Sequence, residues 1–217
     1  MTLLESGLEK CGISKAEIEV IAPKMETYIK ELILFNSAYN LTNTSDHDEL
    51  VTNHILDSLS TYKTISGLVE KADASYIVAD IGSGGGLPGI PLAAAFPQVE
   101  FRLVERMAKR CAFLENCAAI LGLKNVEVIN SEAEKIPDNS FNLVVFRAFR
   151  PLDQKMTKTL LRITKKDGIL AAYKAKEESI KDEMEGIKDL AGNYQIEKLY
   201  VPGLEDKERN LVLITKS

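Results

Sequence analysis

The 217-residue sequence predicts an α/β fold, in which a largely parallel sheet with helices on both faces follows an N-terminal helical extension. Three observations support this expectation. Short apolar runs alternate with amphipathic segments from residue 76 onward, a glycine-rich loop follows the first run, and residues 1–67 show only helical periodicity. We therefore expect two domains, a helical cap over residues 1–67 and an α/β domain over residues 68–217.

The composition is that of a soluble globular protein, with 45% hydrophobic and 27% charged residues. No basic leader precedes an apolar stretch and no run has membrane-spanning length, so we expect neither secretion nor membrane insertion. Three cysteines without C-x-x-C spacing suit a reducing cytoplasm, where we expect the protein, and argue against a disulfide framework or zinc site.

Positive charge is concentrated in one part of the chain. Residues 141–176 contain nine Lys or Arg and two Asp, so this segment carries +7 within a chain whose net charge is −5. A basic face on an acidic body could steer a polyanion such as RNA. A solvated helix face explains the same pattern about as well.

The cap contains two predicted helix starts. Ser14 and Glu17 form a capping-box pattern, after which Pro23 allows a new start or a kink. A break at residues 40–43 precedes a second capping box at Ser45–Asp48. The apolar faces of the two segments comprise Met25, Tyr28, Ile29, Leu32, Phe35 and Tyr39, and then Val51, Ile55, Leu59 and Tyr62.

His54 and Asp57 lie one turn apart on the second segment. A metal site would need further ligands, which the chain does not offer at suitable spacing, so we expect no metal. A contact that orders the helix is the simpler explanation of this pair.

The segment Tyr76–Pro91 organises the α/β domain. Tyr76–Ala79 reads as a buried strand, and Pro88 can open the following helix. Between them lies a loop whose glycines allow positive φ and close approach of a ligand to the backbone. These glycines are Gly82, Gly84, Gly85, Gly86 and Gly89. A strand, glycine loop and helix form the first βα turn of a nucleotide-binding domain.

The loop does not fit a dinucleotide fingerprint. In G-x-G-x-x-G, a start at Gly82 puts Leu87 at the third glycine position, and a start at Gly84 reaches Gly89 only past Pro88. The run D-x-G-x-G-x-G over residues 80–86 instead resembles motif I of S-adenosylmethionine methyltransferases. A tight turn that binds nothing remains the alternative.

A second strand, Glu100–Val104, ends in Glu105. A carboxylate at this place can accept hydrogen bonds from both hydroxyls of an adenosine ribose. An ordinary exposed strand-end acid is the alternative.

The remaining chain continues the alternation. We expect strands at Val126–Ile129, Leu143–Phe146 and Ile169–Tyr173, helices at Lys109–Leu121, from Pro151 and at Glu177–Leu190, and an antiparallel hairpin of Gln195–Val201 with Asn210–Thr215. Ligands bind beyond the carboxyl ends of parallel strands, where this sequence places Asp80, Glu105, Ala133 with Glu134, Arg147 and Lys174. This convergence predicts an active site.

The chemistry that each kind of acceptor atom requires narrows the choice of methyl acceptor. Pyrimidine carbon-5 needs a cysteine nucleophile, and no cysteine lies at a strand's carboxyl end. The Asn/Asp-Pro-Pro-aromatic turn used for adenine amino groups is absent, because Arg147–Pro151 follows the fourth strand. Guanine N7 has an in-plane lone pair and no proton to remove, so it fits a site with no evident general base.

The chain resembles the bacterial 16S ribosomal RNA guanine-N7 methyltransferases, also called glucose-inhibited division protein B. The resemblance covers nearly the whole chain. It rests on Y-N-L-T at residues 39–42, H-I-L-D-S at 54–58, D-I-G-S-G-G-G-L-P-G-I-P-L at 80–92, Lys109-Arg110 with Phe113-Leu114, Arg147-Ala148, Val201-Pro202 and R-N-L-V at 209–212.

The resemblance implies a Rossmann-like class I fold, S-adenosyl-L-methionine as cofactor, and 16S ribosomal RNA or the small ribosomal subunit as partner. Implied cofactor contacts are Gly82, Gly84, Gly86, Leu87, Glu105, Ala133, Glu134 and Arg147. Expected RNA contacts are Asn40, His54, Asp57, Arg150, Lys174 and Arg209. Arg147 and Lys174 are candidates for positioning the reacting groups, since no general base is expected. Ala175 follows Lys174 at a place where the family usually has glycine.

A second class of function stays open. A non-catalytic nucleotide-binding or NAD-linked regulatory protein would use the same kind of loop, although Leu87 argues against NAD.

Overall fold

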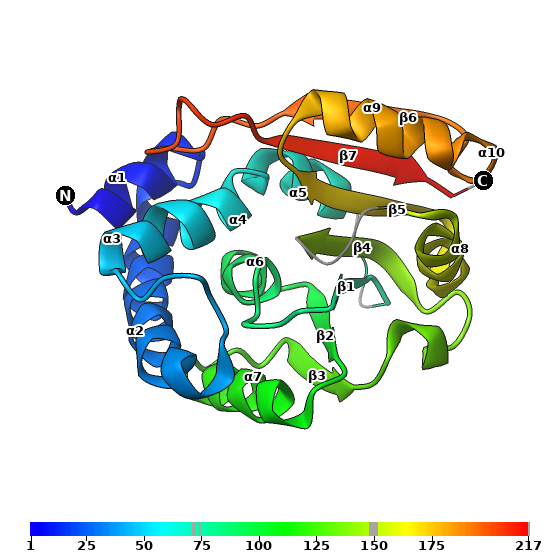
Figure 1. Ribbon diagram of the computed structural model, residues 1–217. Helices are drawn as coiled ribbons and strands as arrows, with labels where there is room; N and C mark the ends of the chain where they lie inside the picture. Colours follow the sequence, from blue (N-terminus) through cyan, green and yellow to red (C-terminus); the bar gives the residue numbers. More distant parts are fainter. Residues whose placement is uncertain (71–72, 74, 148–151, 217) are drawn as a thin grey trace.

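The computed structural model describes residues 1–70, 73, 75–147 and 152–216. Its centre is a seven-stranded sheet of order β3-β2-β1-β4-β5-β7-β6 (Figure 1). Neighbours from β3 to β5 are parallel, whereas β7 lies antiparallel between β5 and β6. The strands are β1 (Ile77–Ile81), β2 (Glu100–Glu105), β3 (Val126–Asn130), β4 (Phe141–Arg147), β5 (Thr164–Lys174), β6 (Tyr194–Lys198) and β7 (Asn210–Thr215).

This topology confirms the predicted α/β fold with its C-terminal hairpin. The strand order reverses between β1 and β4, so the chain leaves these neighbouring strands toward opposite flanks of the sheet. The crevice beyond their carboxyl ends is the usual ligand site of such sheets. The glycine loop leaves β1 there, and Arg147 ends β4.

Helices cover both faces of the sheet (Figure 1). One buried cluster joins one sheet face to α6 (Gly89–Ala95), α7 (Ala108–Ile120) and the N-terminal helices. A second cluster lies between the other face and α8 (Gln154–Ile163), α9 (Glu177–Gly186) and α10 (Lys188–Ala191). The single helix expected at Glu177–Leu190 is therefore wrong, because the chain breaks at Ile187 (φ −123°). Pro151, expected to open α8, lies outside the described residues, and Asp153 caps that helix.

The N-terminal helices are α1 (Leu3–Lys10), α2 (Lys15–Tyr39), α3 (His47–Leu50), α4 (Asp57–Leu59) and α5 (Tyr62–Val69), with a π-helical segment at Val51–Leu56. They join the sheet domain through α2, which packs against α6 and α7, and through α4, which packs against α6. Ser14 and Glu17 make the predicted capping box. Pro23 neither breaks nor restarts α2, because the buried face of this 25-residue helix runs unbroken past it from Ile18 to Leu32. That packing outweighs the roughly 3 kcal/mol that an interior proline costs a helix.

Two further local predictions need correction. The capping box expected at Ser45–Asp48 is wrong, since Asp46 caps α3 by accepting from the Glu49 N–H, and the Ser45 hydroxyl accepts from Asn36. The expected regular helix through Val51 and Ile55 contains a π-helical segment, a feature that often marks functional sites.

One buried hydrophobic cluster includes Leu8 and Leu32 of the cap together with Leu103 of β2. The division into domains at residue 68 stays a prediction. Within the described residues, no helix has both the length and the apolar character needed to cross a membrane.

Candidate active site

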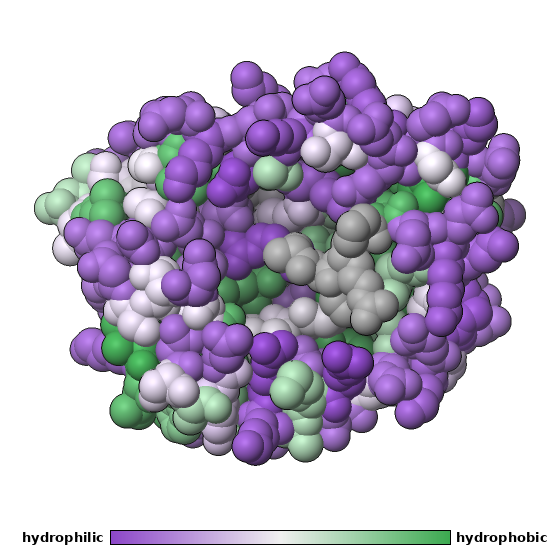
Figure 2. Space-filling view, viewed as in Figure 1, coloured by the Kyte–Doolittle hydropathy of each residue, from purple (hydrophilic) through white to green (hydrophobic). Residues whose placement is uncertain are grey.

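Two cavities lie beyond the carboxyl ends of the strands. The larger, about 970 Å³, lies between the sheet, the cap and the β6–β7 connection, and the smaller, about 390 Å³, lies beyond β2. Both are lined by Gly82 and by Arg110, so they adjoin at the glycine loop. Figure 2 shows this face hollowed near its centre, with hydrophilic side chains along much of the rim.

The glycine loop takes a conformation that needs glycine. Gly82, Gly84 and Gly86 have φ of 70°, 59° and 92°, in the left-handed region that L-residues rarely adopt. The loop is held by N–H groups of Gly82 and Ser83, which both donate to the Val104 carbonyl. A Cβ on Gly84 would meet only the Gly82 carbonyl within 4 Å, which indicates that the loop backbone borders open space. This cradle fits the cofactor that the motif implies.

Asp80 supports the loop from beneath. Its Oδ2 accepts from the Ser83 hydroxyl (2.7 Å) and the Gly89 N–H (2.9 Å), whereas the buried Oδ1 has no partner among the described residues. Burial raises the pKa of the Asp80 carboxyl to about 6, despite these bonds and the attraction of Arg147.

This shifted group predicts a pH dependence of stability. The folded protein binds a proton at Asp80 more tightly than the unfolded chain, whose carboxyl has a pKa near 3.8. The contribution of Asp80 is therefore fully present below about pH 4 and is lost as pH rises to about 6, a loss of roughly 3 kcal/mol. We expect Asp80→Asn to remove this change, measured as the difference between wild-type and variant unfolding free energies across pH 4–7. A constant difference would contradict the assignment.

Glu105 lies at the wall between the loop and the smaller cavity. Its Oε2 accepts from the Gly84 N–H (3.0 Å) and its Oε1 from the Met107 N–H (2.9 Å), so the carboxylate is fixed in place. Ala133 and Glu134 line the same cavity, and Arg162 donates to both of their carbonyls. Three residues expected beside adenosine thus surround one cavity.

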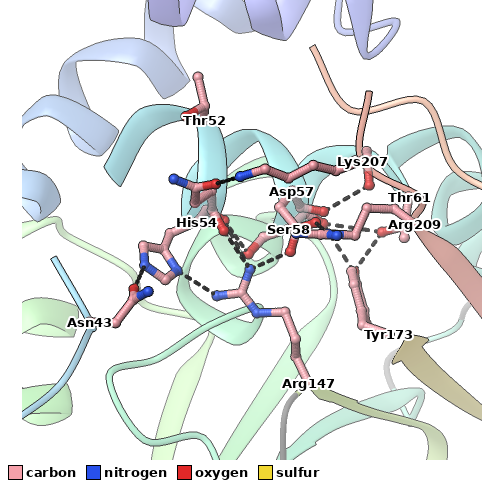
Figure 3. Close-up of polar contacts among 12 residues, drawn as sticks. Asn43, Thr52, His54, Asp57, Ser58, Thr61, Arg147, Tyr173, Lys207 and Arg209 are labelled. Carbon is pink, nitrogen blue, oxygen red and sulfur yellow. Dashed lines mark hydrogen bonds and ion pairs between the residues drawn. The ribbon is translucent and has the colours of Figure 1, made fainter. Parts of the chain in front are cut away.

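Arg147 is the centre of a partly buried polar cluster (Figure 3). Its Nη1 donates to Asp57 Oδ2 at 2.6 Å and to the carbonyls of Asn53 (3.3 Å) and His54 (3.5 Å), while Nη2 donates to His54 Nδ1 at 3.1 Å. Asp57 also accepts from Arg209 Nε at 3.0 Å. One carboxylate therefore holds two guanidinium groups, and the cluster keeps a net positive charge.

The expected contact between His54 and Asp57 is replaced by a shared partner: within the described residues the two side chains make no hydrogen bond with each other, and both bind Arg147. Burial and the neighbouring Arg147 lower the pKa of His54 to about 4, so the ring is neutral at physiological pH. No group of three or more His, Cys, Asp or Glu side chains suited to a metal ion occurs in the described part of the chain.

The other predicted contacts are distributed unevenly. Lys174 lines the larger cavity but is paired with Glu183, and Arg209 lines the same cavity. Asn40 ends α2 in the left-handed conformation, and its carbonyl accepts from Arg110. Gly86 lies beneath the loop, facing Ile90 and Tyr28, rather than at a cavity wall. Arg150 lies outside the described residues.

Sequence reasoning missed several residues of the larger cavity. They are Asn43, Asn53, Arg110, Tyr173 and Lys207. Arg110 stood within a motif and Tyr173 ended a predicted strand, so both could have been found, whereas the other three reach the cavity through packing between distant segments. Four of the nine basic residues of segment 141–176 are used in internal contacts, so the segment is not one continuous basic face; they are Arg147, Arg162, Lys165 and Lys174.

A family model described as "GidB: rRNA small subunit methyltransferase G" matches residues 21–212. The chain belongs to this family. The predicted family, fold and S-adenosylmethionine-dependent methyltransferase activity are thereby confirmed, and no observation favours the NAD-linked or non-catalytic alternative.

Relatives in this family cover almost the whole chain. The "Ribosomal RNA small subunit methyltransferase G" of Treponema denticola is 40% identical over 99% of this chain and 94% of its own. The protein of that name from Hydrogenovibrio crunogenus is 39% identical over 89% of this chain and 84% of its own.

Solved structures support the fold. The tRNA (m1A58) methyltransferase TrmI of Aquifex aeolicus superposes with a TM-score of 0.55 and 14% identity, over 72% of this chain and 69% of that one. Pyrococcus horikoshii TYW2 in complex with MeSAdo gives a TM-score of 0.51 and 16% identity, over 73% and 64% of the two chains.

Proposed function

We propose that this protein transfers the methyl group of S-adenosylmethionine to N7 of a guanine in 16S ribosomal RNA, acting on the small ribosomal subunit in the cytoplasm. The observation that carries the proposal is the pair of adjoining cavities at the glycine loop of a GidB-family chain. One cavity suits the adenosine end of the cofactor, and the other suits its methionine end together with a base.

In this proposal the smaller cavity holds adenosine. Glu105 accepts from the ribose hydroxyls, and Ala133 with Glu134 borders the adenine. The backbone of Gly82, Gly84 and Leu87 borders the methionine end in the larger cavity. Arg147 provides a fixed positive charge beside that end, suited to a carboxylate.

The acceptor needs positioning more than acid–base help. When bound, the cofactor supplies an electrophilic methyl group on a sulfonium. The N7 lone pair forms the new bond to that carbon as the carbon–sulfur bond breaks, so no proton must be removed and the positive charge passes to the base. The larger cavity, with a volume of about 970 Å³, has room for a base turned out of its stack.

Cations around the larger cavity suit RNA phosphates. Arg209 and Lys207 come from the β6–β7 connection, and Arg110 comes from the start of α7. Arg209 keeps Nη2 without a partner among the described residues, while its Nε is held by Asp57. Such a fixed guanidinium matches a phosphate at little entropic cost.

Glu105→Gln should weaken cofactor binding. The amide keeps the size of the side chain but replaces an acceptor oxygen with a donor, so we expect the Kd for S-adenosylhomocysteine to rise about tenfold or more in calorimetry. Glu132→Gln is the matched control, because Glu132 lines the same cavity and loses the same charge. Equal affinities of the two variants would remove Glu105 from the ribose contact.

Transfer of labelled methyl groups tests the function itself. Small subunits that lack the modification would be incubated with the protein and labelled S-adenosylmethionine, and the RNA would be digested to nucleosides. We expect the label in 7-methylguanosine. Label in another nucleoside, or no label despite calorimetric cofactor binding, would overturn the choice of acceptor.

A further inference from the structure

Three side chains form a hydrogen-bonded row from β4 to the wall of the larger cavity (Figure 3). Arg147 Nη2 lies 3.1 Å from His54 Nδ1, and His54 Nε2 lies 3.3 Å from Asn43 Oδ1. A guanidinium can only donate, so Nδ1 accepts and the ring proton sits on Nε2. His54 therefore donates to the amide oxygen of Asn43.

At neutral pH the hydrogen bonds of this row all run in one direction, from Arg147 through His54 to Asn43. The pKa of His54 is lowered to about 4 by burial and by Arg147, so the ring does not gain a second proton. With its oxygen engaged, Asn43 presents its Nδ2 group, whose two N–H donors have no acceptor among the described residues. The amide is thus oriented by a row anchored in the ion pair of Arg147 with the buried Asp57.

Most other uncharged side chains of this cavity have their donors engaged. The acceptors are Thr44 O for Thr42, Asp80 for Ser83, Ser58 O for Tyr173 and Ala175 O for Asn210. Asn53 also lines the cavity with its amide N–H groups unpaired within the described chain, but its oxygen is held only by the exposed Lys207, whose Nζ lies 3.5 Å away. Of the two amides with free donors, Asn43 is the one whose orientation is set by a side chain that is itself held in place, because His54 is bonded to Arg147.

We propose that Asn43 determines the choice of base, because its Nδ2 group donates to O6 of the acceptor guanine in an orientation that Arg147 fixes through His54. O6 lies beside N7 on the same edge of guanine, and both atoms are acceptors. Adenine carries an amino donor at that place and would face the amide donor unpaired. This inference rests on the proposed function.

The substitution Asn43→Asp tests it. The carboxylate keeps an acceptor for His54 and the size of the side chain but loses the donor toward the base. Small subunits would be reconstituted with 16S RNA that carries, at the methylated position, either guanine or diaminopurine, in which an amino group replaces O6. We expect the wild type to prefer guanine, and the ratio of kcat/KM values to fall about tenfold or more in the variant. Partial unfolding would lower both rates and leave the ratio unchanged.

Asn53→Asp is the matched control, since it makes the same charge change in the same cavity. We expect it to keep the wild-type ratio. An unchanged ratio in Asn43→Asp, or an equal fall in both variants, would overturn the role of Asn43. If the wild type methylates neither RNA at N7, the proposed function fails and this inference fails with it.

Discussion

Arg147→Ala is expected to lower kcat/KM for methyl transfer by about 100-fold. The substitution removes a fixed cation beside the proposed site of the cofactor's methionine end and also releases four contacts with Asn53, His54 and Asp57. Asp57 keeps Arg209 as its remaining partner, so we expect the unfolding free energy to fall by only about 1–3 kcal/mol. Methyl transfer from labelled cofactor and urea unfolding measure the two effects.

A second substitution separates activity from stability in this experiment. In Arg147→Ala combined with Asp57→Ala, the buried carboxylate that lost a partner is gone, so part of the stability should return. Activity should stay low, because the cation is still missing. Recovery of activity in the double variant, or wild-type activity of folded Arg147→Ala, would show that Arg147 serves the fold alone.

Gly86→Ala is expected to lower the unfolding free energy by about 2–5 kcal/mol and to abolish cofactor binding at ordinary concentrations. Gly86 has φ of 92°, and an added Cβ would lie 2.6 Å from Ile90 Cγ1 and 2.9 Å from Leu114 Cδ2. Backbone strain and overpacking therefore act together. Denaturant unfolding and calorimetry with S-adenosylhomocysteine measure the two losses.

Two other glycines separate the effect of backbone strain from the effect of overpacking. Gly122 has φ of 64° but open space around a Cβ, so Gly122→Ala should cost about 1 kcal/mol from strain alone. Gly186 has neither a positive φ nor a close neighbour, so alanine there should be neutral or stabilise by up to about 1 kcal/mol. If the loss at Gly86 were no larger than at Gly122, packing against the loop would carry little of the effect.

The sheet was predictable because each strand carries a local apolar signal and ends in polar chemistry. Asp80, Glu105, Arg147 and Lys174 all lie at carboxyl ends of strands, as the sequence predicts. The glycine loop was equally readable, since its positive φ angles need glycine wherever the loop folds. Both signals come from residues that are close together in the sequence, so they can be recognised without knowledge of the tertiary contacts.

Contacts between residues far apart in the sequence could not be predicted in the same way. The contact of Arg147 with Asp57 joins residues 90 positions apart, and that of Asp57 with Arg209 joins residues 152 apart. No periodicity encodes such pairs. The uninterrupted α2 at Pro23 is a related case, because burial of its face against other elements overrides a local penalty.

The hydrogen bond from the Tyr28 hydroxyl to the Gly85 carbonyl has a consequence for how this enzyme can be divided. Tyr28 is fully buried, and Leu41 of the cap also lies against Gly85. The loop proposed to bind the cofactor is thus held from outside the sheet by two residues of the N-terminal segment, Tyr28 and Leu41. A fragment beginning at residue 68 would keep the glycine motif but lose both residues that hold Gly85. In this chain the cap and the motif therefore have to be kept in the same polypeptide.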